Sequence, residues 1–187
     1  MLASDPSHLE AEAAPLEPAP TTTDLFRAYA SHAWRALRRL GVSASDVEDV
    51  CQEVFITVHR RLPTFEGRSS LLTWIYGICV KVAADHRKRL RTRRERMAEF
   101  AAEPIASSQL ADPIAIREAR AKLDRILDGL EDSKRAVFVL YEIEELPMGE
   151  VATALGVPIQ TAYSRLHAAR AEVAAAIGRA ANEESSP

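Results

Sequence analysis

The sequence has little of what disulfide-rich, membrane-spanning or exported proteins need. Its 187 residues include only 2 cysteines, Cys51 and Cys79, and both fall within apolar helical patterns. Such thiols are typical of reduced, buried side chains in a cytosolic protein. The longest apolar stretch, Leu71 to Val80, is far shorter than the roughly 20 residues that span a bilayer. No basic segment precedes an apolar block near the N-terminus, so the sequence predicts a cytoplasmic protein without a signal peptide or membrane insertion.

Motifs of catalytic and metal sites are also missing. The sequence contains no glycine-rich phosphate loop and no motif of a nucleophilic enzyme. The histidines lack the spacing to cysteine or carboxylate residues that a metal site requires; they are His8, His32, His59, His86 and His167. We therefore predict that the protein is not an enzyme and uses no cofactor or metal ion.

Helical periodicity fills two separate blocks of the chain. Residues 1–23 are acidic, rich in proline and free of Lys and Arg, which predicts a disordered tail. Helical spacing of apolar residues then runs through 24–96 and resumes in 119–178. Residues 97–118 lose the pattern and read as a flexible linker, and 179–187 read as a small polar tail. Because no segment shows strand alternation, we predict an all-α protein of two small helical domains joined by a flexible linker.

Three helices are expected in the first domain. Apolar residues recur at helical spacing from Leu25, and Gly41 lies where this helix should stop. A second helix should be capped by Ser45 and has an apolar face rich in valine. A third should begin at Ser69 or Ser70 and continue into a basic tract.

The second domain contains the pattern of a helix-turn-helix. Gly156 can adopt the left-handed conformation of a tight turn, and Val157, Ala162 and Leu166 can close a small core. Pro147 offers no side-chain acceptor, so the capping box of the first helix is incomplete. Polar side chains of the second helix could meet phosphates or base edges in a major groove: Gln160, Thr161, Tyr163, Ser164, Arg165, His167 and Arg170. The alternative is a solvated helix over an ordinary three-helix core.

An acidic stripe lies opposite the valine face of the second predicted helix. Its members share one side of the helix at i, i+3 and i+7 spacing: Asp46, Asp49 and Glu53, with Gln52 beside them. Such a stripe either faces solvent or docks on a basic protein surface, because carboxylates repel nucleic acids.

The third predicted helix has the opposite character. From Lys81 to Arg96 it carries eight basic and two acidic residues, with Trp74 and Tyr76 just upstream. Basic residues beside an off-core aromatic ring suit a nucleic-acid strand with unstacked bases. The candidates for binding such a strand are Trp74, Tyr76, Lys81, Arg87, Lys88 and Arg91. For Trp74 taken alone a place in the core is favoured over strand binding, and for Tyr76 a place in the core is the alternative.

Three motifs in this order resemble the sigma-70 family of RNA polymerase sigma factors, in its extracytoplasmic function (ECF, group IV) class. The segment Asp46 to Phe55 is similar to region 2.2 of the family. Thr73 to Tyr76, followed by Asp85, is similar to regions 2.3 to 2.4, and Ser164 to Arg170 is similar to the region 4.2 recognition helix. The resemblance covers about residues 24–96 and 120–177.

This resemblance implies a dissociable initiation factor that binds core RNA polymerase and helps to open promoter DNA. The acidic stripe would dock on the polymerase, whose β′ clamp helices and β flap are the expected contacts. The aromatic and basic candidates of the third helix would capture the -10 strand, and the helix-turn-helix candidates would read the -35 duplex. Factors of this class are often held by an anti-sigma factor, so such a partner is expected.

The sequence departs from the family pattern at both DNA-reading motifs. The family usually carries Arg and later Asn where this chain has Gly77 and Lys81. In the recognition helix, Gln160, Tyr163 and Ala168 replace the usual Gly, Lys and Arg. We therefore expect unusual promoter preferences, whereas the polymerase-docking stripe is unchanged.

A stand-alone helix-turn-helix regulator that binds duplex operators as a dimer is the alternative. A net charge of -3 and a pI of about 6.0 are low for a protein that relies on its own phosphate contacts. The sequence also lacks heptads for dimerisation. Tight duplex binding without polymerase would favour the regulator.

Overall fold

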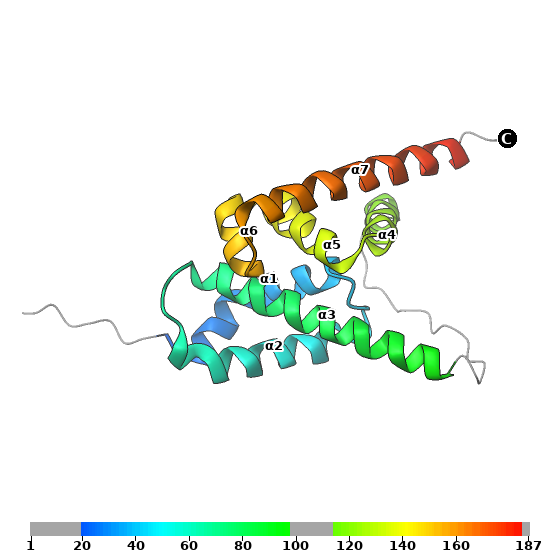
Figure 1. Cartoon of the computed structure of the whole chain (residues 1–187). Helices are drawn as coiled ribbons and strands as arrows, with labels where there is room; N and C mark the ends of the chain where they lie inside the picture. The colour runs from blue at the N-terminus through cyan, green and yellow to red at the C-terminus, as the bar shows by residue number, and fades with distance from the viewer. Residues whose placement is uncertain (1–19, 98–113, 185–187) are drawn as a thin grey trace, which may run out of the picture.

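The computed structural model describes residues 20–97 and 114–184, and every regular element in these ranges is helical (Figure 1). The first half of the described chain contains α1 (Thr22–Arg39), α2 (Val47–Arg61), the short 3-10 helix η1 (Leu62–Thr64) and α3 (Leu71–Met97). The second half contains α4 (Ile114–Asp128), α5 (Asp132–Phe138), the π-helical segment η2 (Val139–Ile143), α6 (Met148–Leu155) and α7 (Ile159–Glu184). The all-helical prediction is confirmed.

Parts of the predicted organisation lie outside these ranges. Residues 1–19, which make up most of the predicted acidic tail, are not among the described residues, and neither are 98–113 of the predicted linker. Helix α4 begins at Ile114, within the last part of the predicted linker. Among the described helices, none is both long and apolar enough to cross a lipid bilayer.

Helix α1 begins with a complete capping box. Thr21 Oγ1 accepts a hydrogen bond from the Asp24 backbone N–H at 3.2 Å, and Asp24 Oδ2 accepts one from the Thr21 N–H at 3.0 Å. Hydrogen bonds from Thr21 lower the pKa of Asp24, so the carboxylate stays charged at the positive end of the helix dipole. The predicted stop is confirmed, because α1 ends at Arg39 and Gly41 follows with a φ of +90°.

The starts of α2 and α3 test two predicted caps. The predicted Ser45 cap is wrong: α2 begins at Val47, and the backbone N–H of Asp46 donates instead to Ser43 Oγ at 3.2 Å. Ser43 reaches this N–H because the chain turns there before the helix starts. At α3 the expectation holds, since Ser70 Oγ accepts a hydrogen bond from the Thr73 N–H at 3.0 Å.

The helix-turn-helix of the second half is confirmed as α6, a tight turn and α7. Gly156 has a φ of +64°, and the N–H groups of Gly156 and Val157 donate to the carbonyls of Thr153 and Ala152. This pair of hydrogen bonds is the Schellman ending of a helix. Pro147 precedes α6 without a side-chain cap, as predicted. Helix α7 continues to Glu184, beyond the predicted helical block.

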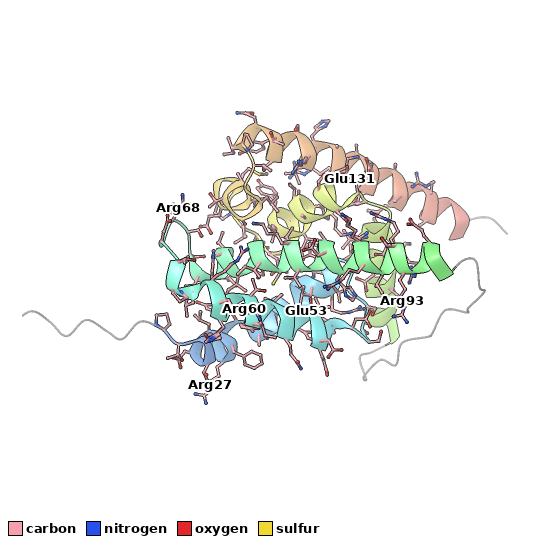
Figure 2. All side chains as sticks on the ribbon, turned by 60° about the horizontal axis from the view of Figure 1, so that its bottom comes forward. Arg27, Glu53, Arg60, Arg68, Arg93 and Glu131 are labelled. Atoms are coloured by element: carbon pink, nitrogen blue, oxygen red, sulfur yellow. The ribbon has the colours of Figure 1, made fainter. Side chains whose placement is uncertain are left out.

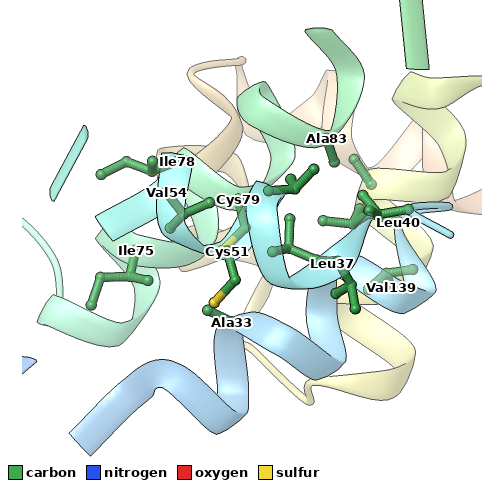
Figure 3. Packing of buried hydrophobic residues seen from close by; sticks show 14 of the residues in the cluster. Ala33, Leu37, Leu40, Cys51, Val54, Ile75, Ile78, Cys79, Ala83 and Val139 are labelled. Atoms are coloured by element: carbon green, nitrogen blue, oxygen red, sulfur yellow. The ribbon is translucent and has the colours of Figure 1, made fainter. Parts of the chain in front are cut away.

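Two buried clusters join the halves of the molecule. The larger one contains Leu37, Val54 and Ile75 of the first half, all fully buried, together with Val139 and Ala169 of the second half. Figure 3 shows Val139 close to Leu37 in this cluster. The sequence pattern does not predict this shared core, because helical spacing shows which face is buried and not what covers it.

The smaller cluster is centred on the helix-turn-helix. Val151 and Leu166 of the second half pack there with Ala36 of α1 and Tyr76 of α3. Helix α3 therefore contacts α1 and α2 on one side and α6 on another (Figure 1). The two halves pack against each other along α3.

Candidate nucleic-acid interface and docking face

The acidic stripe lies on the outer side of α2. Asp49, Gln52 and Glu53 are exposed there, and Asp46 is half-buried at the start of the helix. The valine face opposite packs into the core. Figure 2 shows Glu53 on the exposed side of α2. The stripe is therefore accessible to a partner in this conformation.

Helix α3 borders the acidic stripe with basic side chains. Asp46 Oδ2 lies 3.2 Å from His86 Nε2, and Arg89 Nη2 donates to Glu53 Oε2 at 2.9 Å. Partial burial raises the pKa of Asp46, but hydrogen bonds from Ser43, Ser45 and His86 outweigh it and hold this pKa below its usual value. The Asp46 carboxylate therefore stays charged. A cleft of about 290 Å³ lies between the two helices at this place.

Two large exposed apolar side chains of the first half were missed by the sequence reasoning. Ile56 is 50% exposed and follows Glu53 by one turn of α2, and Phe26 of α1 is 47% exposed. The Phe26 ring packs edge-on against Phe55 with 4.9 Å between ring centroids. The sequence does contain a signal for Ile56, because it is an apolar residue on the otherwise polar side of α2. The outer side of α2 thus combines charge with the apolar area of Ile56, a combination found at protein interfaces.

Five of the six strand-binding candidates on α3 are accessible at least in part. Lys81, Lys88 and Arg91 are exposed, and Trp74 and Arg87 are half-buried. The Trp74 ring lies against Phe65, with 5.1 Å between ring centroids. Trp74 therefore belongs partly to the core and partly to the surface.

Two of the six candidates, Tyr76 and Arg87, are engaged by the second half. Tyr76 is only 2% exposed, and its hydroxyl donates to Glu144. Burial first, and then the hydrogen bond to Glu144, raise the pKa of Tyr76 above its usual value, so the hydroxyl keeps its proton. Arg87 is partly buried and forms an ion pair with Asp132 of α5. Tyr76 does lie off the core of the first half, as predicted, but the second half covers it.

A cleft of about 600 Å³ opens beside Trp74. The first half supplies two aromatic rings and three cationic side chains to its lining, while α6 supplies one wall: Phe65, Trp74, Arg61, Arg68 and Lys81, with Thr153 and Ala154. We call it the aromatic-basic cleft. Arg61, Phe65 and Arg68 were missed by the sequence reasoning, although a basic, aromatic turn directly before α3 is visible in the sequence.

The polar side of α7 is accessible along its first three turns. Exposed residues alternate with the buried Ala162, Leu166 and Ala169, which hold the helix on the core. The candidates Gln160, Tyr163, Ser164, His167 and Arg170 are exposed, and Thr161 and Arg165 are half-buried. We call these seven residues the recognition face.

At the end of the recognition face, Arg170 is anchored by the second half itself. Its Nε donates to Glu142 Oε1 at 2.6 Å, and its guanidinium lies 5.7 Å from the centroid of the Tyr141 ring. This arrangement fixes the guanidinium at the end of the recognition face.

Comparison with known proteins matches each half separately. The family description "Sigma-70 region 2" matches residues 25–94, and "Sigma-70, region 4" matches residues 120–173. The ECF RNA polymerase sigma-E factor of Escherichia coli is 30% identical over 138 residues, which cover 69% of this chain and 72% of that protein. The chain belongs to the sigma-70 family and is an ECF RNA polymerase sigma factor.

Two further proteins that are similar to this chain are also sigma factors. The ECF RNA polymerase sigma factor SigE of Mycolicibacterium smegmatis is 33% identical over 162 residues, covering 82% of this chain but 60% of that protein's length. Among solved structures, the sigma factor RpoE in complex with the anti-sigma factor NepR from Bartonella quintana has a TM-score of 0.62 at 16% identity. The matched parts cover 83% of this chain and 96% of that one, which establishes a similar fold.

The family assignment confirms the resemblance seen in the sequence. In this sigma factor, region 2 includes the acidic stripe of α2 and the basic helix α3, and region 4 includes the helix-turn-helix. The alternative of a stand-alone helix-turn-helix regulator is not favoured, because the chain also contains sigma-70 region 2 beside the helix-turn-helix.

Proposed function

We propose that this sigma factor docks on core RNA polymerase through the outer side of α2 and directs it to promoters with two separate DNA-binding surfaces. The observation that carries the proposal is the coexistence of three distinct surfaces: the exposed acidic stripe, the aromatic-basic cleft and the recognition face. Carboxylates repel the phosphates of DNA, whereas the other two surfaces offer cationic side chains and hydrogen-bond donors.

The polymerase contact uses the stripe of Asp46, Asp49, Gln52 and Glu53. Its expected partner is the basic surface of the β′ clamp helices, with the β flap as a second docking point for region 4. Ile56 adds exposed apolar area beside the charges. Charge steers the encounter, and desolvation of this side chain contributes to affinity.

The two DNA elements are bound by different physical means. The recognition face of α7 enters the major groove of the -35 duplex, where Arg165 and its polar neighbours meet base edges and phosphates. The -10 strand is bound as unstacked bases, with Trp74 and Phe65 as stacking surfaces and Lys81 and Arg91 near phosphates. The protein contributes binding and no bond-making chemistry, and it acts in the cytoplasm beside the polymerase.

An anti-sigma factor is the further partner that we propose. The similar solved structure of RpoE is a complex with an anti-sigma factor. Such a partner would control the factor by covering its polymerase-docking or DNA-binding surfaces.

The polymerase contact is tested by co-purification with core polymerase. Asp49→Arg combined with Glu53→Arg should abolish co-purification, because it turns the stripe from acidic to basic. Glu145→Arg combined with Glu172→Arg makes the same change in net charge at exposed positions of the second half and should leave co-purification unchanged. Equal binding by both double variants would contradict the docking role of α2.

A further inference from the structure

Two large apolar side chains are exposed at the start of α7. Ile159 is 43% exposed and Tyr163 is 49% exposed. They lie at i and i+4 and therefore share a side of the helix, and both are outside the two buried clusters that the described residues form. We call them the apolar pair. Neither is needed to hold α7 on the core, because Ala162, Leu166 and Ala169 do that.

Gln160 stands beside the apolar pair and is also exposed. It lies at i and Tyr163 at i+3, so these two side chains also share a side of the helix. All three residues are at the N-terminal end of α7, which begins at Ile159. In a helix-turn-helix, the N-terminal residues of the second helix are the ones that contact base edges in the major groove. The start of α7 therefore presents one amide group and two apolar side chains to DNA.

The arginines of the recognition face lie away from this group. Arg165 is half-buried and, by helical spacing, lies on a different side of α7 from Gln160. Arg170 is at the far end of the face, where its Nε donates to Glu142. The segment from Ile159 to Tyr163 contains no Lys or Arg. Because Lys and Arg are the side chains that bind guanine O6 and N7, the start of α7 does not favour guanine.

Adenine and thymine have the groups that match these side chains in the major groove. A glutamine amide accepts a hydrogen bond from the adenine N6 amino group and donates one to N7, and an apolar side chain contacts the C5 methyl group of thymine. A G·C pair would bring guanine O6 to the amide oxygen of Gln160 and the cytosine amino group to the side chain of Ile159. Polar atoms would then be desolvated without a partner, which costs binding free energy.

We infer that the start of α7 recognises A·T base pairs in the -35 duplex, with Gln160 on an adenine and the apolar pair on thymine methyl groups. This inference rests on the proposed function of α7 and adds the base preference of that surface. Gln160 and Tyr163 are two of the positions at which this chain departs from the family pattern, and Ile159 was missed by the sequence reasoning. The preference is therefore a property of this chain's own residues.

The test is a selection with the holoenzyme, which is the full-length chain bound to core RNA polymerase. It acts on duplex promoters whose -35 element is randomised. The wild-type holoenzyme should select A·T pairs at neighbouring positions of the element. Gln160→Arg should change one selected adenine to guanine, because arginine binds guanine O6 and N7. Loss of a merely structural side chain would not exchange one selected base for another.

Holoenzyme binding to single duplexes then separates the two kinds of contact. A G·C pair in place of the A·T pair selected through Gln160 should weaken wild-type binding about tenfold, but that of Gln160→Ala by less than about twofold. Uracil in place of the selected thymine removes only the methyl group and should weaken wild-type binding about threefold. Ile159→Ala combined with Tyr163→Ala should bind both duplexes equally. Ile177→Ala is the matched control, because Ile177 is 50% exposed on α7 beyond the recognition face, and it should keep the threefold difference.

Two outcomes would overturn the base preference alone. One is the same selected element for the wild type and Gln160→Arg, while Arg165→Ala does alter the selection. The other is an equal effect of uracil on the wild type and on the double variant, which would mean that the apolar pair meets a protein instead of DNA. If Arg165→Ala also left the selected element unchanged, α7 would not bind the -35 duplex, and the proposed function would fail together with the inference.

Discussion

The two surfaces that we propose to bind DNA are both rich in hydrogen-bond donors but differ in accessibility. The recognition face of α7 is open along its length, with Tyr163 49% exposed. On α3, Tyr76 and Arg87 are held by Glu144 and Asp132 of the second half. The comparison shows that residue type alone does not make a surface available, since availability depends on what packs against it.

The reason for the difference is geometric. Helix α7 buries one narrow side, formed by Ala162, Leu166 and Ala169, and leaves the rest to solvent. Helix α3 buries Ile75 and Cys79 against α1 and α2, and a second side against α6. A helix between two layers has less free surface than a helix on the outside of one.

The largest effect is expected where the halves meet at Gly41. This glycine has a φ of +90°, and an added Cβ would overlap with the guanidinium of Arg135, which is 1% exposed. We expect Gly41→Ala to lower the free energy of unfolding by about 2–3 kcal/mol. Gly67→Ala is the control, because Gly67 has a φ of +69° but open space around it, and it should cost about 1 kcal/mol.

Urea unfolding measures both changes and also tests the contact between the halves. The 2 tryptophans, Trp34 and Trp74, lie in the first half and report on it by fluorescence, whereas circular dichroism reports on both halves. If the halves unfold together, Gly41→Ala shifts both signals equally. A shift of fluorescence alone would break the comparison, because it would mean that the second half is not held by the first.

The second prediction concerns the open surface. Arg165→Ala should weaken binding of the polymerase holoenzyme to the -35 duplex about tenfold, or about 1.4 kcal/mol, the cost of losing one good contact to a base. Arg179→Ala, an exposed position farther along α7, should leave the affinity unchanged. Association with the polymerase should stay intact in both variants, and its loss in Arg165→Ala would indicate misfolding instead.

The smallest effect is expected for the covered hydroxyl of Tyr76. Tyr76→Phe removes one hydrogen bond to Glu144, which Arg39 still partners, so the free energy of unfolding at neutral pH should fall by about 1 kcal/mol. Because the pKa of Tyr76 is raised from its usual value of 10.0, its stabilising contribution is complete below that pH. Above it, the unfolded chain loses the proton while the folded one keeps it, so stability falls.

Urea midpoints of the wild type and Tyr76→Phe, compared between about pH 9 and 11, measure this dependence. The wild type should lose stability more steeply than the variant. If the urea midpoints of both proteins changed equally with pH, the burial of Tyr76 by the second half would be contradicted. The side of α3 that carries Tyr76 would then be as accessible as the recognition face of α7.

The helices and the turn were predictable because they depend on neighbours in the chain. Gly41 and Gly156 ended helices where expected, since each adopts a positive φ that other residues avoid. The Ser45 cap was wrong because three hydroxyl or carboxylate groups compete within four residues, and Ser43 forms the bond to the backbone. The far end of α7 was missed because its alanine-rich sequence has high helix propensity but little apolar pattern.

By itself the sequence determined the helices, the helix-turn-helix and the faces that carry acidic or basic side chains. Periodicity and turn chemistry act over a few residues, so they can be read from the chain. Only the tertiary structure decided that α6 packs over Tyr76 and that the backbone of Ala154 lies close to Gly77. It also decided that Arg61 and Phe65 line one cleft with Trp74. These contacts join residues distant in the chain, and their energies depend on packing that local sequence does not encode.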